Sequence, residues 1–240
     1  MITFDFTHKI VFVTGATGNL GAAAADAFAA AGAHLILADR RADRLSQRFP
    51  QLAADPRHLL LPGFDVSDPE IIAAGVAAAQ ARFGRIDVLA NSVGGYRAGA
   101  PVHETSPADW DFMMNLNART AFLLSRAVIP GMIAQGSGKI IHVSSRAGLA
   151  GGANAAAYSA SKAALLRLVE SLAAETKAHG VNVNCILPGV IDTPQNRQDM
   201  PGADFDRWVS PSALAGVMLF LASDMAAPIH GAAIPAYGLS

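Results

Sequence analysis

The sequence predicts an α/β fold in which one parallel sheet is doubly wound, with helices covering both faces. Short apolar runs of about four to six residues, rich in Val, Ile and Leu, alternate along the chain with longer helical patterns. A glycine-rich turn follows the first of these runs. The 240 residues show no repeat, low-complexity tract or linker, so we expect one domain over residues 1–240.

Strands are predicted where an apolar run ends at turn residues. The first, at residues 9–14, leads into the glycine-rich turn, and Gly32 separates the Ala-rich helix after that turn from the second strand. Apolar runs of this kind, covered by helices on both sides, are typical of parallel sheets. The other strands are predicted at residues 34–38, 59–61, 88–91, 139–144, 181–187 and 232–236.

Helices are predicted between the strands. Ser67 or Asp68, followed by Pro69, forms an N-cap and first-turn pair for one of them. The segment 192–208 lacks strand character and is long for a compact domain, so we expect it to be a substrate loop. Helices are expected after the turn up to residue 31 and at residues 40–49, 67–82, 115–134, 156–179 and 212–222.

Composition and charge indicate which classes of partner the protein is expected to bind. The formal net charge is −1 and no basic run occurs, so we expect neither nucleic acid nor an anionic membrane as a partner. The lone Cys185 lies in an apolar run and allows no disulfide within one chain, which fits a reducing cytoplasm. Residues 1–5 do not resemble a signal peptide, and the apolar stretch 213–222 is too short to span a bilayer. His142 is expected to be a packed histidine, and no metal site is predicted.

The first strand, the glycine-rich turn, the next helix and the second strand form a unit typical of dinucleotide-binding, Rossmann-type folds. Glycines allow the backbone to approach a pyrophosphate closely, and the helix N-terminus supplies N–H groups and a favourable dipole. We therefore expect cofactor contacts from this turn, which comprises Gly15, Ala16, Thr17, Gly18, Asn19, Leu20 and Gly21.

An acidic residue ends the second strand. Asp39 should accept hydrogen bonds from the ribose hydroxyls of an adenosine and repel a 2′-phosphate, which favours NAD(H). Arg40 and Arg41 oppose this preference because guanidinium groups bind phosphate, so NADP(H) stays an alternative. Asp65 follows the third strand and either contacts the adenine or caps the next helix.

Tyr158 and Lys162 are four residues apart on a predicted helix, so they lie on one face of it. An ammonium group beside a phenol favours the phenolate and lowers its pKa. This predicts that Tyr158 donates and accepts a proton near neutral pH, as general acid–base catalysis requires.

Taken together, these stretches resemble the short-chain dehydrogenase/reductase family in its compact single-domain branch. The matching residues run in the family's order over nearly the whole chain. They are Thr14 to Ala16, Asp65 and Val66, Asn91 to Gly94, Asn117 with Phe122, Ser144 and Ser145, Tyr158 to Lys162, and Pro188 to Thr193. The resemblance implies a seven-stranded parallel sheet, a nicotinamide cofactor and hydride transfer to or from a small carbonyl, alcohol or imine. It also implies a homotetramer or homodimer.

The resemblance also assigns roles to individual residues. Tyr158 resembles the family's catalytic acid/base, and Lys162 its partner, which also holds the nicotinamide ribose. Ser145 resembles the residue that polarises the substrate oxygen, with Ser144 as the rival. Asn117 resembles the helix residue that holds the water of a proton relay, with Asn115 as the rival. Further cofactor contacts are implied at Val66, Asn91, Pro188, Gly189, Ile191 and Thr193, the last two to the carboxamide.

Two positions depart from the compact branch. Asn19 stands where glycine is usual, and asparagine tolerates left-handed backbone better than other residues with a side chain. Ser92 and Val93 replace the usual Asn-Ala after Asn91, which we expect to affect strand packing more than chemistry.

The segment after Thr193 and the Gly94-Gly95-Tyr96 turn resemble those of dihydropteridine reductases, an NADH-using group of the same family. Tyr96 or Trp208 could then stack on a flat heterocycle at the site mouth. Ser145 favours ordinary carbonyl reduction instead, because that group typically lacks a serine there. The alternative from another class is a nucleotide-sensing protein without catalysis; the presence of both Tyr158 and Lys162 favours the enzyme.

Overall fold

A computed structural model describes residues 3–240 and shows seven parallel strands in one sheet, in the order β3-β2-β1-β4-β5-β6-β7. The predicted fold class is therefore confirmed. The strand order reverses between β1 and β4, which opens a crevice at the carboxyl ends of these strands. The strands are β1 Ile10–Thr14, β2 His34–Asp39, β3 Leu59–Pro62, β4 Val88–Asn91, β5 Gly138–Val143, β6 Val181–Pro188 and β7 Ala233–Ala236.

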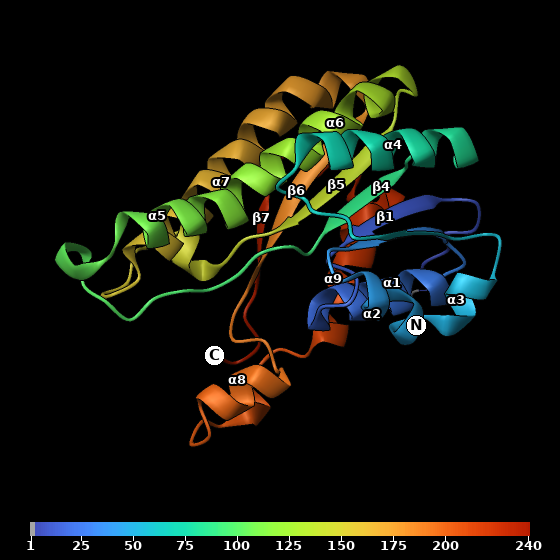
Figure 1. Ribbon diagram of the computed structural model, residues 1–240. Helices are drawn as coiled ribbons and strands as arrows, with labels where there is room; N and C mark the ends of the chain where they lie inside the picture. The colour runs from blue at the N-terminus through green and yellow to red at the C-terminus, as the bar shows by residue number, and fades with distance from the viewer. Residues whose placement is uncertain (1–2) are drawn as a thin grey trace.

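Helices cover both faces of the sheet (Figure 1). On one face lie α4 Pro69–Phe83, α6 Thr120–Ala134 and α7 Ala156–Thr176, with α5 Pro107–Met113 extending beyond the strand ends. The other face is covered by α1 Asn19–Ala30, α2 Ala42–Arg48, α3 Pro50–Ala54 and α9 Pro211–Ala222.

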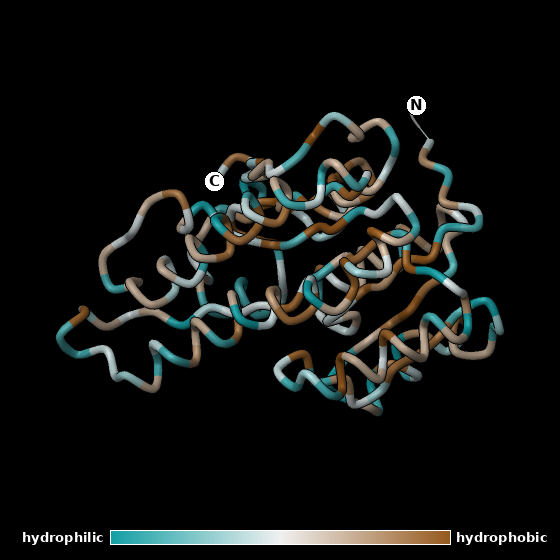
Figure 2. Tube along the Cα trace, turned by 90° about the horizontal axis from the view of Figure 1, so that it is seen from above, coloured by the Kyte–Doolittle hydropathy of each residue, from teal (hydrophilic) through white to brown (hydrophobic). Residues whose placement is uncertain are grey.

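Alternate side chains along the strands pack into the two apolar layers, one on each face of the sheet. In β1, Val11 and Val13 pack towards α1 and α9, whereas Phe12 packs towards α4 and α6. All three are fully buried. The hydropathy-coloured tube accordingly shows its brown segments along the central strands and in the helix faces that cover them (Figure 2). None of the helices in residues 3–240 combines the length and hydropathy needed to cross a membrane.

The long helix before β5 begins earlier than predicted. It begins at Pro107, behind an N-cap in which Ser106 accepts a hydrogen bond from the Asp109 amide, rather than at residue 115. The segment Met114–Arg119 then forms a π-helical turn before α6 continues. Pi-turns of this kind are frequent at functional sites. The Ser-Pro-x-Asp pattern was the sequence signal that could have placed this start correctly.

The segment 192–208 contains local helical structure. Thr193 caps the short helix α8 Pro194–Asp199, and a 3₁₀ turn covers Phe205–Arg207. Its two ends meet where Ile191 pairs with Val209. Figure 1 shows α8 standing apart from the sheet, below the carboxyl ends of the strands.

Candidate functional site

Two cavities open at the carboxyl ends of the central strands. One has a volume of about 520 Å³ and the other about 530 Å³, and both are lined by Ser92, Val93 and Gly94 just after β4. Because the cavities share this wall, they form one cleft above the strand-order reversal. The first cavity reaches the end of β2, and the second reaches the ends of β5 and β6.

The glycine-rich turn forms part of the floor of the cleft. Gly15 has a φ of +67°, a conformation that glycine adopts without strain. A Cβ at Gly21 would overlap the carbonyl oxygen of Gly15, so the first turn of α1 and the loop pack backbone to backbone. Asn19 is the first residue of α1 and has no left-handed φ, so its expected left-handed backbone is not needed. The turn keeps its geometry through Gly15.

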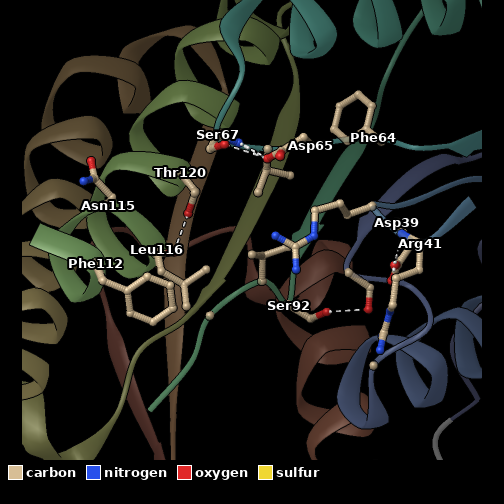
Figure 3. Close-up of a pocket in the computed structure, with 16 residues that line it drawn as sticks. Asp39, Arg41, Phe64, Asp65, Ser67, Ser92, Phe112, Asn115, Leu116 and Thr120 are labelled. Atoms are coloured by element: carbon tan, nitrogen blue, oxygen red, sulfur yellow. Dashed lines mark hydrogen bonds and ion pairs between the residues drawn. The ribbon is translucent and has the colours of Figure 1, made fainter. Parts of the chain in front are cut away.

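Asp39 lies at the edge of the first cavity (Figure 3). One carboxylate oxygen accepts hydrogen bonds from the amide and hydroxyl of Thr17, at 3.1 and 2.6 Å, and the other from the Arg41 amide at 2.9 Å. Burial alone would raise the pKa of Asp39, but the hydrogen bonds from Thr17 and Arg41 outweigh it and lower the pKa. The carboxylate therefore stays ionised at the place expected for a ribose partner.

The opposite wall of the first cavity is partly apolar. Figure 3 shows Phe112 and Leu116 facing Asp39 and Arg41 across the space. Both belong to the helical segment that begins at Pro107, and neither was predicted as a site residue. Phe112 lies before the predicted start at residue 115, whereas Leu116 lies inside the predicted helix and carried no motif. Val66 also lines this cavity.

Asp65 lines the first cavity and also makes a local turn. Its carboxylate accepts hydrogen bonds from the amide and hydroxyl of Ser67, at 2.9 and 2.7 Å. These hydrogen bonds lower its pKa. Asp68, not Ser67, caps α4. The first cavity thus presents two carboxylates, with Arg40 and Arg41 also in its wall.

The second cavity brings together Ser145, from the segment just after β5, with Tyr158 and Lys162 of α7. Ser145 caps the 3₁₀ turn Arg146–Gly148. The ring of Tyr96 meets the ring of Tyr158 edge to face, with centroids 4.8 Å apart, and is itself 71% exposed. Ser144 also lines this cavity, and its hydroxyl donates a hydrogen bond to the carbonyl oxygen of Lys162. Both serines lie beyond the end of β5, so the choice of Ser145 over Ser144 stays a prediction.

The electrostatics of this group differ from the expectation. Burial raises the pKa of Tyr158, and a hydrogen bond from Ser145 offsets only part of that effect. Burial also lowers the pKa of Lys162 to about 8. Lys162 Nζ donates to the carbonyl oxygen of Val143 at 3.0 Å and lies 5.9 Å from the centre of the Tyr158 ring. The prediction that Lys162 lowers the pKa of Tyr158 is therefore wrong. Desolvation is the largest influence on the pKa of both groups.

Asn117 is buried in the π-helical turn. Its side chain exchanges two hydrogen bonds with the backbone of Gly95, and its amide also donates to Ser161 on α7. A Cβ at Gly94 would lie 3.0 Å from Asn117 Oδ1 and 3.1 Å from Lys162 Nζ. A Cβ at this position would therefore require Asn117 or Lys162 to shift by a few tenths of an ångström. Asn115 instead lines the first cavity.

Asn91 lies below the cleft rather than in its wall. Its Oδ1 accepts hydrogen bonds from Thr14 Oγ1 and the Val93 amide, and its Nδ2 contacts His142. His142 is fully buried, also contacts Ser125, and has its pKa lowered to about 4 by burial. These bonds tie β1, β4, β5 and α6 together beneath the site.

The other predicted site residues divide into two groups. Leu20, Pro188, Gly189 and Ile191 line the second cavity, and Gly18 lines the first. Outside both walls lie Thr193, whose hydroxyl caps α8, and Trp208, whose ring packs on Phe205 with centroids 4.8 Å apart. The same segment instead contributes Asn196 and Met200. Asn196 and Met200 belong to the predicted substrate loop but were not named as site residues, and Arg146 carried no recognisable motif in the sequence.

Comparison with known proteins gives independent support for the predicted family. A family model described as short chain dehydrogenase matches residues 9–203. The D-threitol dehydrogenase of Mycolicibacterium smegmatis is 36% identical over 242 residues, covering 96% of this chain and 93% of that protein. The 2-dehydro-3-deoxy-D-gluconate 5-dehydrogenase of Dickeya dadantii is 32% identical, covering 98% and 96%. A crystal structure of gox2181 superposes with a TM-score of 0.90 at 28% identity, covering 98% and 96%.

Proposed function

The chain belongs to the short-chain dehydrogenase family, and from that premise we propose that Tyr158 is the proton-transferring group of the reaction. The protein is an NAD(P)-dependent oxidoreductase that acts on small alcohol or carbonyl substrates. One observation carries the proposal: Tyr158, Ser145 and Lys162 lie together in the wall of one cavity, beside a cleft that ends at Asp39.

The cleft suits a dinucleotide. The glycine-rich turn offers its backbone to a pyrophosphate, and Asp39 offers an ionised carboxylate to a ribose. Gly94 lines both cavities and leaves room there that a side chain would take up. We infer a preference for NAD(H), because the Asp39 carboxylate repels a 2′-phosphate, although Arg40 and Arg41 lie beside it.

When bound, the nicotinamide supplies the hydride donor or acceptor. Ser145 holds the substrate oxygen, and Tyr158 gives its proton to a carbonyl oxygen or takes one from an alcohol. The raised pKa of Tyr158 keeps the phenol protonated at neutral pH. Carbonyl reduction therefore suits neutral pH, and alcohol oxidation should accelerate as the pH rises towards the pKa of Tyr158.

Lys162 and Asn117 are proposed to support this proton transfer. Lys162 places a charge beside the phenol and the nicotinamide ribose, while Asn117 holds the loop around Gly94 through Gly95. The proposed water-bridged relay runs between them. Thr193 and Ile191 are proposed to contact the carboxamide, Ile191 from the cavity wall.

For the substrate, we propose a small polyhydroxylated alcohol or its ketone. The two relatives act, by their names, on a polyol and on a sugar acid. Pteridine reduction and nucleotide sensing without catalysis stay alternatives. In the pteridine case Tyr96 is the proposed stacking residue, because Trp208 lies outside both cavity walls. We also propose a homodimer or homotetramer, because Trp110 and Phe122 are 44% and 46% exposed on neighbouring helices. We propose a cytoplasmic location because the lone cysteine, Cys185, is buried and allows no disulfide within one chain.

The test is NAD⁺- and NADP⁺-dependent oxidation of threitol, 2,3-butanediol and gluconate, with NADH-dependent reduction of ketones and of quinonoid dihydropteridine. Tyr158→Phe should lower turnover by roughly 10²- to 10⁴-fold and leave cofactor affinity almost unchanged, because only the ionisable oxygen is removed. Retention of most activity by Tyr158→Phe would show that another group transfers the proton. Cofactor binding without turnover of any substrate would favour the nucleotide-sensing alternative.

A further inference from the structure

Arg146 is a cation in the wall of the second cavity. It follows Ser145 directly and lines the same space as Tyr158. Among residues 3–240, the charged side chains in that wall are Lys162 and Arg146, and no Asp or Glu of these residues lines it. A cleft lined by charge of one sign raises the local concentration of ligands of the opposite sign. The cavity therefore favours an anionic substrate over a neutral one.

The backbone beneath Arg146 is held in place. Ser145 Oγ accepts a hydrogen bond from the Ala147 amide at 3.2 Å and so fixes the start of the 3₁₀ turn. Gly148 ends that turn against α7, where a Cβ would come within 2.9 Å of the backbone carbonyl of Lys162. The turn thus sets the position of Arg146 relative to the helix that carries Tyr158 and Lys162.

The Arg146 guanidinium is positioned by contacts that involve no Asp or Glu side chain of residues 3–240. It lies 5.5 Å from the centre of the Tyr237 ring, and it donates a 3.3 Å hydrogen bond to the main-chain oxygen of Ser240. Within residues 3–240 no Asp or Glu side chain forms an ion pair with it. Arg197 differs, because Asp192 binds it through two hydrogen bonds of 2.6 and 2.8 Å. A guanidinium has five N–H groups, so Arg146 retains donors for a ligand.

We propose that Arg146 is a specificity-determining residue that binds a carboxylate of the substrate, so that the enzyme prefers hydroxy acids to neutral polyols. This inference rests on the proposed function and names the substrate class of the same site. The planar guanidinium matches a carboxylate through two parallel hydrogen bonds, which an ammonium group does not. The reacting carbon lies at Ser145 and Tyr158, and the carboxylate lies a few bonds away at Arg146.

The test compares two pairs of compounds that differ only in a carboxylate: D-threonate with D-threitol, and D-gluconate with D-glucitol. Wild type should use each acid at least about tenfold better by kcat/KM. Arg146→Gln should lower kcat/KM for the acids by about 10- to 100-fold, mainly through KM, and change the polyols by less than about twofold. Arg146→Lys should recover only part of the loss. The matched control, Arg126→Gln, removes the same charge from an exposed position on α6. It should leave kcat/KM unchanged for both the acids and the polyols.

Calorimetric titration of D-threonate into the enzyme–NADH complex provides a readout independent of turnover. Binding should be lost in Arg146→Gln and kept in Arg126→Gln. Equal losses for acids and polyols, a wild-type preference for the polyol, or no binding of D-threonate to wild type would each overturn the inference. Oxidation of polyols without binding of the acid would leave the proposed function standing. Binding that depends on Arg146 without turnover of any alcohol would support the anion site and overturn the proposed reaction.

Discussion

At the scale of single residues, burial determines the chemistry of the site. Lys162 is only 4% exposed, and among residues 3–240 only the Val143 carbonyl oxygen accepts a hydrogen bond from its ammonium group. The donors that remain are available to a cofactor ribose or to the Tyr158 oxygen. Desolvation of this charge lowers the pKa of Lys162 to about 8.

The buried lysine predicts a specific pH dependence of stability. In the folded protein Lys162 releases its proton near pH 8, whereas in the unfolded chain it keeps it up to about 10.5. Between these values the unfolded state binds more protons, so rising pH favours the folded state. The free energy of unfolding of wild type should therefore rise by about 3 kcal/mol relative to Lys162→Met across this window. Urea titrations of both proteins at several pH values measure the difference, and parallel curves would refute the pKa shift.

Asp39 is expected to set the cofactor preference. Wild type should use NADH better than NADPH, and Asp39→Ala should shift the ratio of kcat/KM towards NADPH by at least about tenfold, because it removes the repulsion and frees the Arg41 guanidinium. Asp65→Ala removes a carboxylate from the same cavity and serves as the control, with similar effects on both cofactors. Equal or better use of NADPH by wild type would contradict the proposed preference.

At the scale of elements, the site depends on close packing between backbone segments. The glycine-rich turn and the first turn of α1 meet at Gly15 and Gly21, and Ser92 Oγ ties the end of β4 to the carbonyl oxygen of Thr14. Ser92 thus does more than pack, because it links the turn to the wall shared by both cavities. The π-helical turn similarly carries Asn117 to the loop at Gly95.

The contact between β1, its turn and α1 can be tested with two glycines. Gly21→Ala should destabilise the fold by about 1–3 kcal/mol and weaken NADH binding, because its Cβ would overlap the Gly15 carbonyl oxygen. Gly216→Ala on α9 is the matched control, since its Cβ would meet open space, and it should stabilise the fold by up to about 1 kcal/mol. Thermal unfolding of both variants measures the change in stability, and NADH titrations measure the change in affinity. An unchanged Gly21→Ala protein would show that the turn is less rigid than its packing indicates.

At the scale of the whole molecule, the cleft collects residues from opposite halves of one sheet. Its walls come from the ends of β1 and β2 on one side and of β5 and β6 on the other, joined by the segment after β4. A ligand that spans both cavities would therefore contact most of the sheet at once. Its binding energy would add to the stability of the entire fold.

Cofactor binding should accordingly stabilise the protein against global unfolding. At about 100 times its dissociation constant, NADH should raise the free energy of unfolding by about 2.7 kcal/mol. The gain should persist in Tyr158→Phe, which keeps the cofactor contacts, and should shrink in Gly21→Ala. Chemical denaturation with and without NADH or NADPH measures it. No stabilisation of wild type by either cofactor would exclude the cleft as their site.

The sequence by itself determined the fold class, the strands to within about a residue and the glycine-rich turn. These follow from local rules: apolar runs make buried strands, and spacing along a helix or strand decides which side chains share a face. The start of the helix at Pro107 was missed although its capping pattern is local, so Phe112 was missed with it.

Only the tertiary structure decided the electrostatics and the outer wall of the site. The pKa shifts of Tyr158 and Lys162 arise from desolvation, which depends on everything packed around them and not on their spacing of four residues. Arg146 lies beside Tyr237, 91 positions along the chain, because the 3₁₀ turn after β5 and the segment after β7 end at the same edge of the sheet. Contacts between segments so far apart in the sequence depend on the packing of the whole sheet. No local sequence pattern predicts them.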